Sequence, residues 1–185
     1  EVYRFFRDEL GATFVQFIPI VERATPATLP MANEGWHERA TGPERPLYTQ
    51  TGSLVTDRSV TAERYGRFLI EVFEEWIRHD VGEVFVQMFD SALGAWYGVG
   101  SSMCIFRPTC GDALALEHNG DVYSCDHFVE PAHLVGNLAD GRTLLQIVDS
   151  PAQVAFGTAK RDTLPQYCRS CDVRFACHGG CPKDR

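Results

Sequence analysis

CRSCDVRFACHGGCPKDR, residues 168–185, is the stretch around which this chain is organised. Two, five and three residues separate its four cysteines, which are Cys168, Cys171, Cys177 and Cys181. Thiolates spaced this closely can converge on one metal ion or cluster, and the adjacent glycines Gly179 and Gly180 allow the backbone to fold tightly around it. The stretch therefore predicts a metal-binding segment.

Three further cysteines, Cys104, Cys110 and Cys125, precede this segment, and none occurs earlier. Seven clustered thiols are an odd number and are not distributed as a disulfide framework would be, so metal ligation is favoured over disulfides and incidental core thiols. Asn119-Gly120 predicts a hairpin between residues 113–117 and 121–124. That hairpin should bring Cys125 back beside Cys110, across the ladder.

Length and charge exclude some functions. A chain of 185 residues can form one substantial core, or a core plus a smaller module held by metal. The net charge of -8 argues against a general nucleic-acid binder. No apolar run approaches a membrane span and no signal peptide opens the sequence, so a cytoplasmic location is expected. Because Glu1 begins within an apparent helix, we expect the chain to be a piece of a longer protein.

The N-terminal half alternates predicted helices and short apolar strands, as in a parallel α/β layer. Helices are expected at residues 2–10 and 62–79, the second capped by Thr61, and strands at 14–20 and 83–89. A brief helix capped by Asp90 or Ser91 should follow. Residues 22–57 predict a long loop, whose aromatics Trp36 and Tyr48 more plausibly anchor it than contact substrate.

The C-terminal half predicts a short extended piece at residues 134–138 and helices at 143–148 and 151–160, the last beginning at Pro151. His127 and His178 adjoin cysteines and could replace one on iron, but flanking histidines are more often surface groups.

The cysteine pattern resembles the SPASM domain, the iron-sulfur module at the C-terminus of radical S-adenosylmethionine enzymes that modify peptides. Within that group it is most similar to the anaerobic sulfatase-maturating enzymes. The resemblance rests on the seven cysteine spacings and on three runs: GDVYSCD at 120–126, LVGNL at 134–138 and CHGGCPKDR at 177–185.

The resemblance implies an α/β to α+β fold in two parts. Residues 1–89 would be the C-terminal part of a partial (β/α) barrel. Residues 90–185 would be the SPASM domain, built on a β-hairpin and short helices and truncated at its C-terminus.

The resemblance also assigns ligands. A first auxiliary [4Fe-4S] cluster would be held by Cys104, Cys110, Cys125 and Cys181. A second would be held by Cys168, Cys171, Cys177 and a cysteine beyond Arg185. Asp126 would be the general base that removes the substrate's thiol or hydroxyl proton.

The implied reaction is oxidation of a Cys or Ser in an unfolded sulfatase polypeptide to Cα-formylglycine by a monomeric enzyme. It requires S-adenosylmethionine and a third [4Fe-4S] cluster bound by CxxxCxxC, a motif absent from these residues, so this stretch alone is expected to be inactive. Two alternatives remain: another SPASM-type peptide maturase, or a zinc-stapled binding module using the terminal four cysteines.

Overall fold

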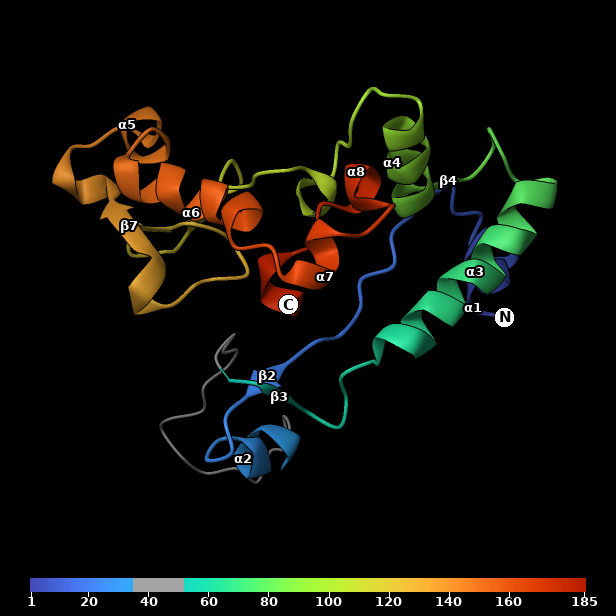
Figure 1. Cartoon of the computed structure of the whole chain (residues 1–185), viewed down its shortest axis with the longest axis horizontal. Helices are drawn as coiled ribbons and strands as arrows, with labels where there is room; N and C mark the ends of the chain where they lie inside the picture. Colours follow the sequence, from blue (N-terminus) through green and yellow to red (C-terminus); the bar gives the residue numbers. More distant parts are fainter. Residues whose placement is uncertain (35–51) are drawn as a thin grey trace.

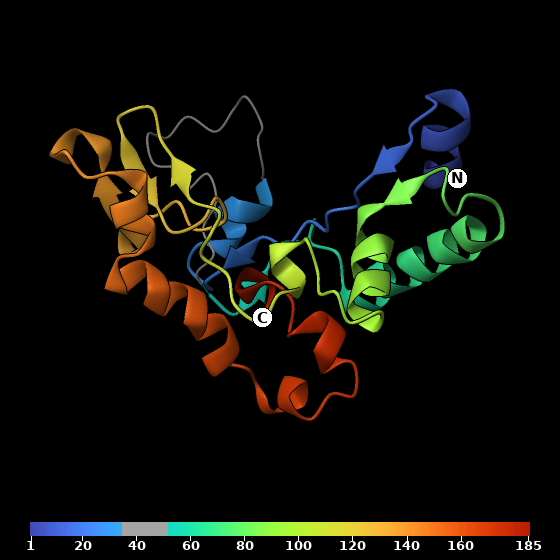
Figure 2. The ribbon, with the colours of Figure 1, turned by 90° about the horizontal axis from the view of Figure 1, so that it is seen from above.

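The computed structural model describes residues 1–34 and 52–185; Trp36 and Tyr48 lie outside these ranges. Figures 1 and 2 show an N-terminal group of α1, α3, β1 and β4 at one end and the hairpin with α5 and α6 at the other, with α4, α7 and α8 between them. The predicted mixture of helices and strands is confirmed. No helix in the described ranges is both long and apolar enough to cross a membrane.

The first predicted helix is confirmed, although its second half is a π-helix, which is wider than an α-helix. α1 (Val2–Arg4) runs directly into the π-helix η1 (Phe5–Glu9). Charged side chains tie this segment to α3 (Ala62–His79), since Arg4 donates hydrogen bonds of 3.0 and 2.7 Å to Glu75. The bonds from Arg4 lower the pKa of Glu75 to about 2. Tyr3 is buried and donates a 2.6 Å hydrogen bond to the Asp80 carboxylate.

Strands β1 (Phe14–Val15) and β4 (Phe85–Val86) pair in parallel. Both are shorter than the predictions for 14–20 and 83–89, which were wrong in extent. The Phe17 carbonyl accepts a 2.8 Å hydrogen bond from the Tyr65 hydroxyl instead of a ladder bond, and residues 87–89 begin α4 (Gln87–Trp96). The helix cap predicted at Asp90 or Ser91 is wrong too, because α4 begins at Gln87 and both residues lie inside it.

Helix α3 covers the N-terminal core as predicted. The Thr61 hydroxyl caps it by accepting a 3.3 Å hydrogen bond from the Arg64 N–H. Its inner face packs on both strands and on α4, and the Trp76 indole donates a 2.7 Å bond to the Val84 carbonyl. The buried core consists of Tyr3, Val72, Trp76, Val84, Val86 and Phe89.

The prediction of an unstructured loop over residues 22–57 is wrong for the parts that the structure describes. β2 (Arg23–Ala24) pairs antiparallel with β3 (Leu54–Val55), and α2 (Leu29–Glu34) follows β2. The Thr56 hydroxyl secures the pairing through a 2.7 Å bond to the Glu22 carboxylate. Strands of two residues are too short to show any hydrophobic period.

The C-terminal half contains the predicted hairpin. β5 (Ala115–Leu116) and β6 (Asp121–Tyr123) pair antiparallel, and β7 (Leu134–Asn137) adds a third strand beside β6. Both predicted helices are confirmed as α5 (Leu144–Val148), with a Thr143 capping box, and α6 (Pro151–Asp162). The remaining elements are α7 (Gln166–Arg169), α8 (Arg174–Cys177) and the 3-10 helices η2 (Cys104–Phe106), η3 (Pro131–His133), η4 (Leu138–Asp140) and η5 (Pro182–Asp184).

Helices α4 and α8 connect the two halves of the chain. The rings of Trp96 and Phe175 meet edge to face with centroids 4.8 Å apart, a favourable aromatic geometry. The segment carrying the last cysteines is thus packed against a helix that also contributes Phe89 to the N-terminal core.

Candidate metal centre

All seven cysteines are free thiols, and they lie in short helices or in the turns between short elements. Cys104 opens η2, Cys125 follows β6, and Cys181 precedes η5. Cys110 lies between η2 and β5, where its N–H donates a 3.2 Å hydrogen bond to the Gly157 carbonyl of α6. Cys104 is exposed, and the other three are partly buried.

These four thiols influence one another electrostatically. Burial raises the pKa values of Cys110 and Cys181, and raises that of Cys125 to about 12. A charge on Cys104 raises the pKa values of Cys110 and Cys181 further, and a charge on Cys181 does so for Cys125. The structure therefore brings the hairpin cysteines and Cys181 into one neighbourhood. Buried thiols that repel each other as thiolates are stabilised in that form by metal.

Helix α6 supports the loops of this site. Gln153 is 1% exposed, and its side-chain nitrogen donates hydrogen bonds of 2.7 Å to the Gly111 carbonyl and 3.0 Å to the Ser124 carbonyl. One amide group thus holds the residue after Cys110 and the residue before Cys125. The predicted position of Cys110 across the ladder from Cys125 is wrong, because β5 begins only at Ala115; Gln153 joins the residues next to the two cysteines instead.

Gly157, one turn further along α6, allows the Cys110 backbone to approach the helix. A Cβ atom at this position would collide with the Cys110 carbonyl oxygen. Lys160 follows, only 1% exposed, and its ammonium donates bonds of 2.6 Å to the Cys104 carbonyl and 2.9 Å to the Ile105 carbonyl. Gln153, Gly157 and Lys160 therefore form one supporting face of α6.

A left-handed turn leads to Cys181. His178, Gly179 and Gly180 have φ angles of 48°, 79° and 66°. Arg185 closes the turn by donating to the carbonyls of Gly179 at 2.9 Å, His178 at 3.0 Å and Lys160 at 2.8 Å. This clamp joins the Cys181 turn to the end of α6.

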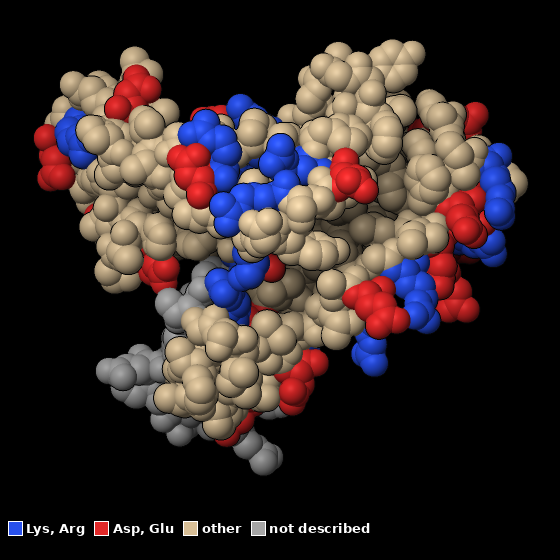
Figure 3. Space-filling view, viewed as in Figure 1, with Lys and Arg blue, Asp and Glu red and all other residues tan. Residues whose placement is uncertain are grey.

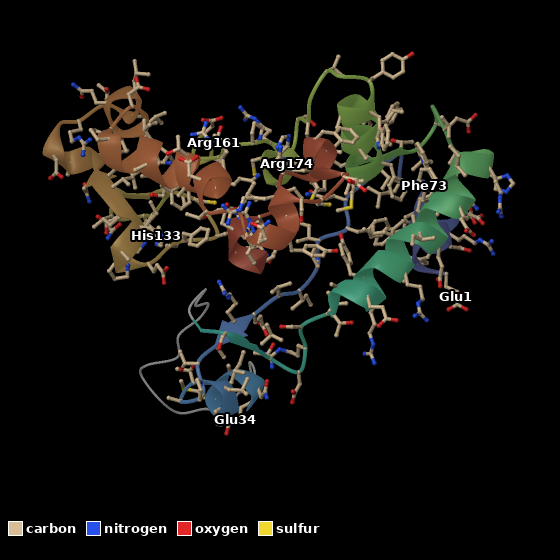
Figure 4. The ribbon with its side chains drawn as sticks, in the orientation of Figure 1. Glu1, Glu34, Phe73, His133, Arg161 and Arg174 are labelled. Carbon is tan, nitrogen blue, oxygen red and sulfur yellow. The ribbon has the colours of Figure 1, made fainter. Side chains whose placement is uncertain are left out.

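The other three cysteines lie in a separate local frame. Cys168 is in α7, Cys177 ends α8, and Cys171 lies between the two helices. The Cys171 N–H donates a 3.4 Å bond to the Cys168 carbonyl, and the Cys171 carbonyl accepts a 3.1 Å bond from Arg174. Figure 4 places Arg174 at the start of α8 and Arg161 near the end of α6. These three cysteines therefore share two short helices and the turn between them.

Cysteine thiolates can hold either a zinc ion or an iron-sulfur cluster. Two thiolates on one zinc ion lie within about 4.6 Å of each other, twice the Zn–S bond of about 2.3 Å. Over residues 1–34 and 52–185, no three cysteine sulfurs lie within 4.8 Å of one another. A cube of four irons takes one thiolate at each iron and so accepts a wider spacing. The thiol donor set fits an iron-sulfur cluster.

Asp126 projects beside this thiol group. Its Oδ1 accepts a 3.1 Å bond from the Cys125 thiol and lies 3.0 Å from His127 Nδ1. Partial burial acts to raise the pKa of Asp126, but the bonds from Cys125 and His127 lower it overall. The side chain is 70% exposed. It is thus a charged, oriented carboxylate open to a ligand, while Cys125, Asp126 and His127 offer three donor atoms within 4.8 Å of one another.

The sequence-based predictions missed Gln153, Lys160 and Arg185. Gln153, Gly157 and Lys160 recur at helical spacing on one face of α6, and a glycine there often marks close backbone contact. That spacing was the available signal for the first two. Nothing local distinguishes Arg185, because its partners are carbonyl groups brought together by folding.

A family model of the SPASM iron-sulfur cluster-binding domain matches residues 104–172. The serine-type anaerobic sulfatase-maturating enzyme of Bacteroides thetaiotaomicron is 42% identical over 187 residues, covering 100% of this chain and 42% of that enzyme. This chain is a homologue of the anaerobic sulfatase-maturating enzymes. The serine-type enzyme of Klebsiella pneumoniae is 33% identical over 139 residues, 75% of this chain and 34% of that enzyme.

Solved structures of a sulfatase-maturating enzyme share the fold. Native anSMEcpe with bound AdoMet aligns with a TM-score of 0.71 at 23% identity, over 98% of this chain and 42% of that one. The same enzyme with AdoMet and the Cp18Cys peptide aligns with a TM-score of 0.72 at 24% identity, over 98% and 43%. The chain thus spans about two fifths of the length of several of these sulfatase-maturating relatives. The SPASM match includes five of the seven cysteines and ends before Cys177 and Cys181.

Proposed function

We propose that this chain is the auxiliary-cluster part of a radical S-adenosylmethionine enzyme that oxidises a sulfatase side chain to Cα-formylglycine. The observation that carries the proposal is the 42% identity, over the whole chain, to a serine-type anaerobic sulfatase-maturating enzyme. Residues 1–89 would complete the partial barrel, in keeping with the parallel β1–β4 pair, and residues 90–185 the SPASM domain. The enzyme would work in the cytoplasm, where thiols stay reduced.

Two ligand sets are proposed. Cys104, Cys110, Cys125 and Cys181 would hold the first auxiliary [4Fe-4S] cluster, supported by their electrostatic proximity. Cys168, Cys171 and Cys177 would hold the second, with a fourth ligand from outside this sequence. Auxiliary clusters, when bound, accept or relay the electron that substrate oxidation releases.

Asp126 is the proposed general base. As a hydrogen atom leaves the substrate β-carbon, the hydroxyl or thiol proton must also leave, and the Asp126 carboxylate can accept it. With Cys125 held as a thiolate on the cluster, the hydrogen bond from His127 would fix one carboxylate oxygen, and exposure leaves the other accessible. The task of this residue is to receive one proton at a fixed place.

A serine target is favoured over cysteine. Whole-chain identity is 42% to the Bacteroides serine-type enzyme, against 24% to the cysteine-type enzyme of Clostridium perfringens. An unfolded sulfatase segment carrying serine is therefore the proposed substrate. The serine hydroxyl would supply the proton that Asp126 receives.

The test is mass spectrometry of a serine-containing sulfatase peptide after anaerobic incubation with the holoenzyme and S-adenosylmethionine. Loss of two hydrogens at the serine is expected, and Asp126→Asn should abolish it while S-adenosylmethionine cleavage continues. Asp172→Asn is the matched control, because Asp172 also directly follows a cysteine but adjoins the second set. It should leave product formation close to that of the unmodified enzyme.

Three results would contradict parts of this proposal. Modification of a different side chain would indicate another peptide maturase. Zinc without iron or sulfide in anaerobically reconstituted protein would favour a zinc-stapled module. Normal product from the Asp126→Asn enzyme would remove Asp126 from the mechanism and leave it as a structural partner of Cys125.

A further inference from the structure

Lys160 is a buried cation that donates hydrogen bonds to uncharged carbonyl groups. It is 1% exposed, and its ammonium binds only the carbonyls of Cys104 and Ile105. Across residues 1–34 and 52–185, no carboxylate lies within ion-pair distance of it. Lys183, 4% exposed, differs because its ammonium pairs with Asp184 at 2.5 Å. Burial of an unpaired charge is costly, so Lys160 requires an anion.

Three of the proposed ligand thiols lie near this ammonium. Burial lowers the pKa of Lys160, whereas negative charges on Cys110, Cys104 and Cys181 raise it. A second cation lies close by, since the Arg185 guanidinium binds the Lys160 carbonyl at 2.8 Å. Figure 3 shows Lys and Arg atoms gathered over this part of the molecule, where α6 and α7 lie in Figure 1. Two cations, Lys160 and Arg185, therefore lie near the proposed ligands in a chain whose net charge is -8.

We propose that Lys160 is the counter-charge of the first auxiliary cluster: it positions the Cys104 turn and raises the cluster's reduction potential. Four thiolates give such a cluster a net negative charge, and reduction adds one more electron. A buried cation nearby stabilises the reduced form more than the oxidised form, because attraction grows with the charge and the low dielectric screens it little. This inference rests on the proposed function, since it assumes a cluster at these four cysteines.

Three variants of the anaerobically reconstituted holoenzyme test the inference. Lys160→Met removes the charge and keeps the length of the side chain, while Lys160→Arg retains the charge. Arg161→Met removes the same charge from the adjacent, exposed position on α6, whose side chain pairs with Asp162. The readouts are iron and sulfide per chain and the midpoint potential from an EPR-monitored redox titration. The signal to follow is the one that Cys104→Ala eliminates.

A more negative midpoint potential is expected for Lys160→Met, with Lys160→Arg and Arg161→Met close to the unmodified protein. Equal shifts in Lys160→Met and Arg161→Met, or none in either, would overturn the inference. If Lys160→Met assembles no cluster, assembly in Lys160→Arg supports the need for charge, and failure in both variants refutes it. An unmodified protein with no signal that depends on Cys104 would instead reject the cluster assignment, and the inference with it.

Discussion

Gly157→Ala tests the close contact between α6 and the Cys110 loop. The added Cβ would collide with the Cys110 carbonyl oxygen and weaken the 3.2 Å bond from the Cys110 N–H. Separating packed groups costs about 1–3 kcal/mol and the weakened hydrogen bond about 0.5–1.5 kcal/mol, whereas alanine restores about 1 kcal/mol of helix propensity. We expect a net loss of about 1–3 kcal/mol in the free energy of unfolding.

Urea denaturation followed by circular dichroism measures this loss, and Gly66→Ala provides the matched control. Gly66 also lies inside a helix, α3, but a Cβ there meets no atom within 4 Å. That substitution should stabilise the protein by up to about 1 kcal/mol. The two substitutions should therefore act in opposite directions. If Gly157→Ala were as stable as Gly66→Ala, the contact with the Cys110 loop would not constrain the site.

Three further outcomes are expected. Tyr3→Phe removes the buried 2.6 Å bond to a carboxylate, and thermal denaturation should show a loss of about 1.5–3 kcal/mol. The bond from Arg4 lowers the pKa of Glu75 from 4.5 to about 2, so its stabilisation is complete above pH 4.5 and is lost as the pH falls toward 2. Glu75→Gln should reduce the pH dependence of the free energy of unfolding over that range. A pH dependence like that of the unmodified protein would contradict the interaction between Arg4 and Glu75. Cys181→Ala should lower iron content at the first set and Cys171→Ala at the second; identical spectra would contradict two separate sites.

Local signals in the sequence predicted several elements well. Asn119-Gly120 predicts the hairpin because glycine readily adopts the left-handed conformation that the turn requires, and Gly120 does so with a φ of 88°. Thr61 and the apolar face of residues 62–79 predict α3 for reasons that act within one helix. The strands at 14–20 and 83–89 were overestimated, because a short apolar run cannot distinguish a strand from the start of a buried helix.

The site is predictable only in part from the sequence. Cysteine spacing identifies the candidate ligands, and a resemblance divides them into two sets, an assignment that stays a prediction. The supports of the first set are tertiary: Gln153 joins Gly111 to Ser124, and Lys160 holds the Cys104 turn. A polar residue in an amphipathic helix looks like a solvated one until its distant partners are known.

The Arg185 clamp also has a consequence for biosynthesis. The ribosome makes Cys125 before Cys181, and at about 5–20 residues per second the interval between them is about 3–10 s. Until Arg185 has emerged, the turn that carries Cys181 lacks its bonds to His178, Gly179 and the end of α6. During this interval Cys104, Cys110 and Cys125 would be present while Cys181 is not yet held in its folded position. A group held by all four of these thiols would therefore be completed only after these residues have been translated.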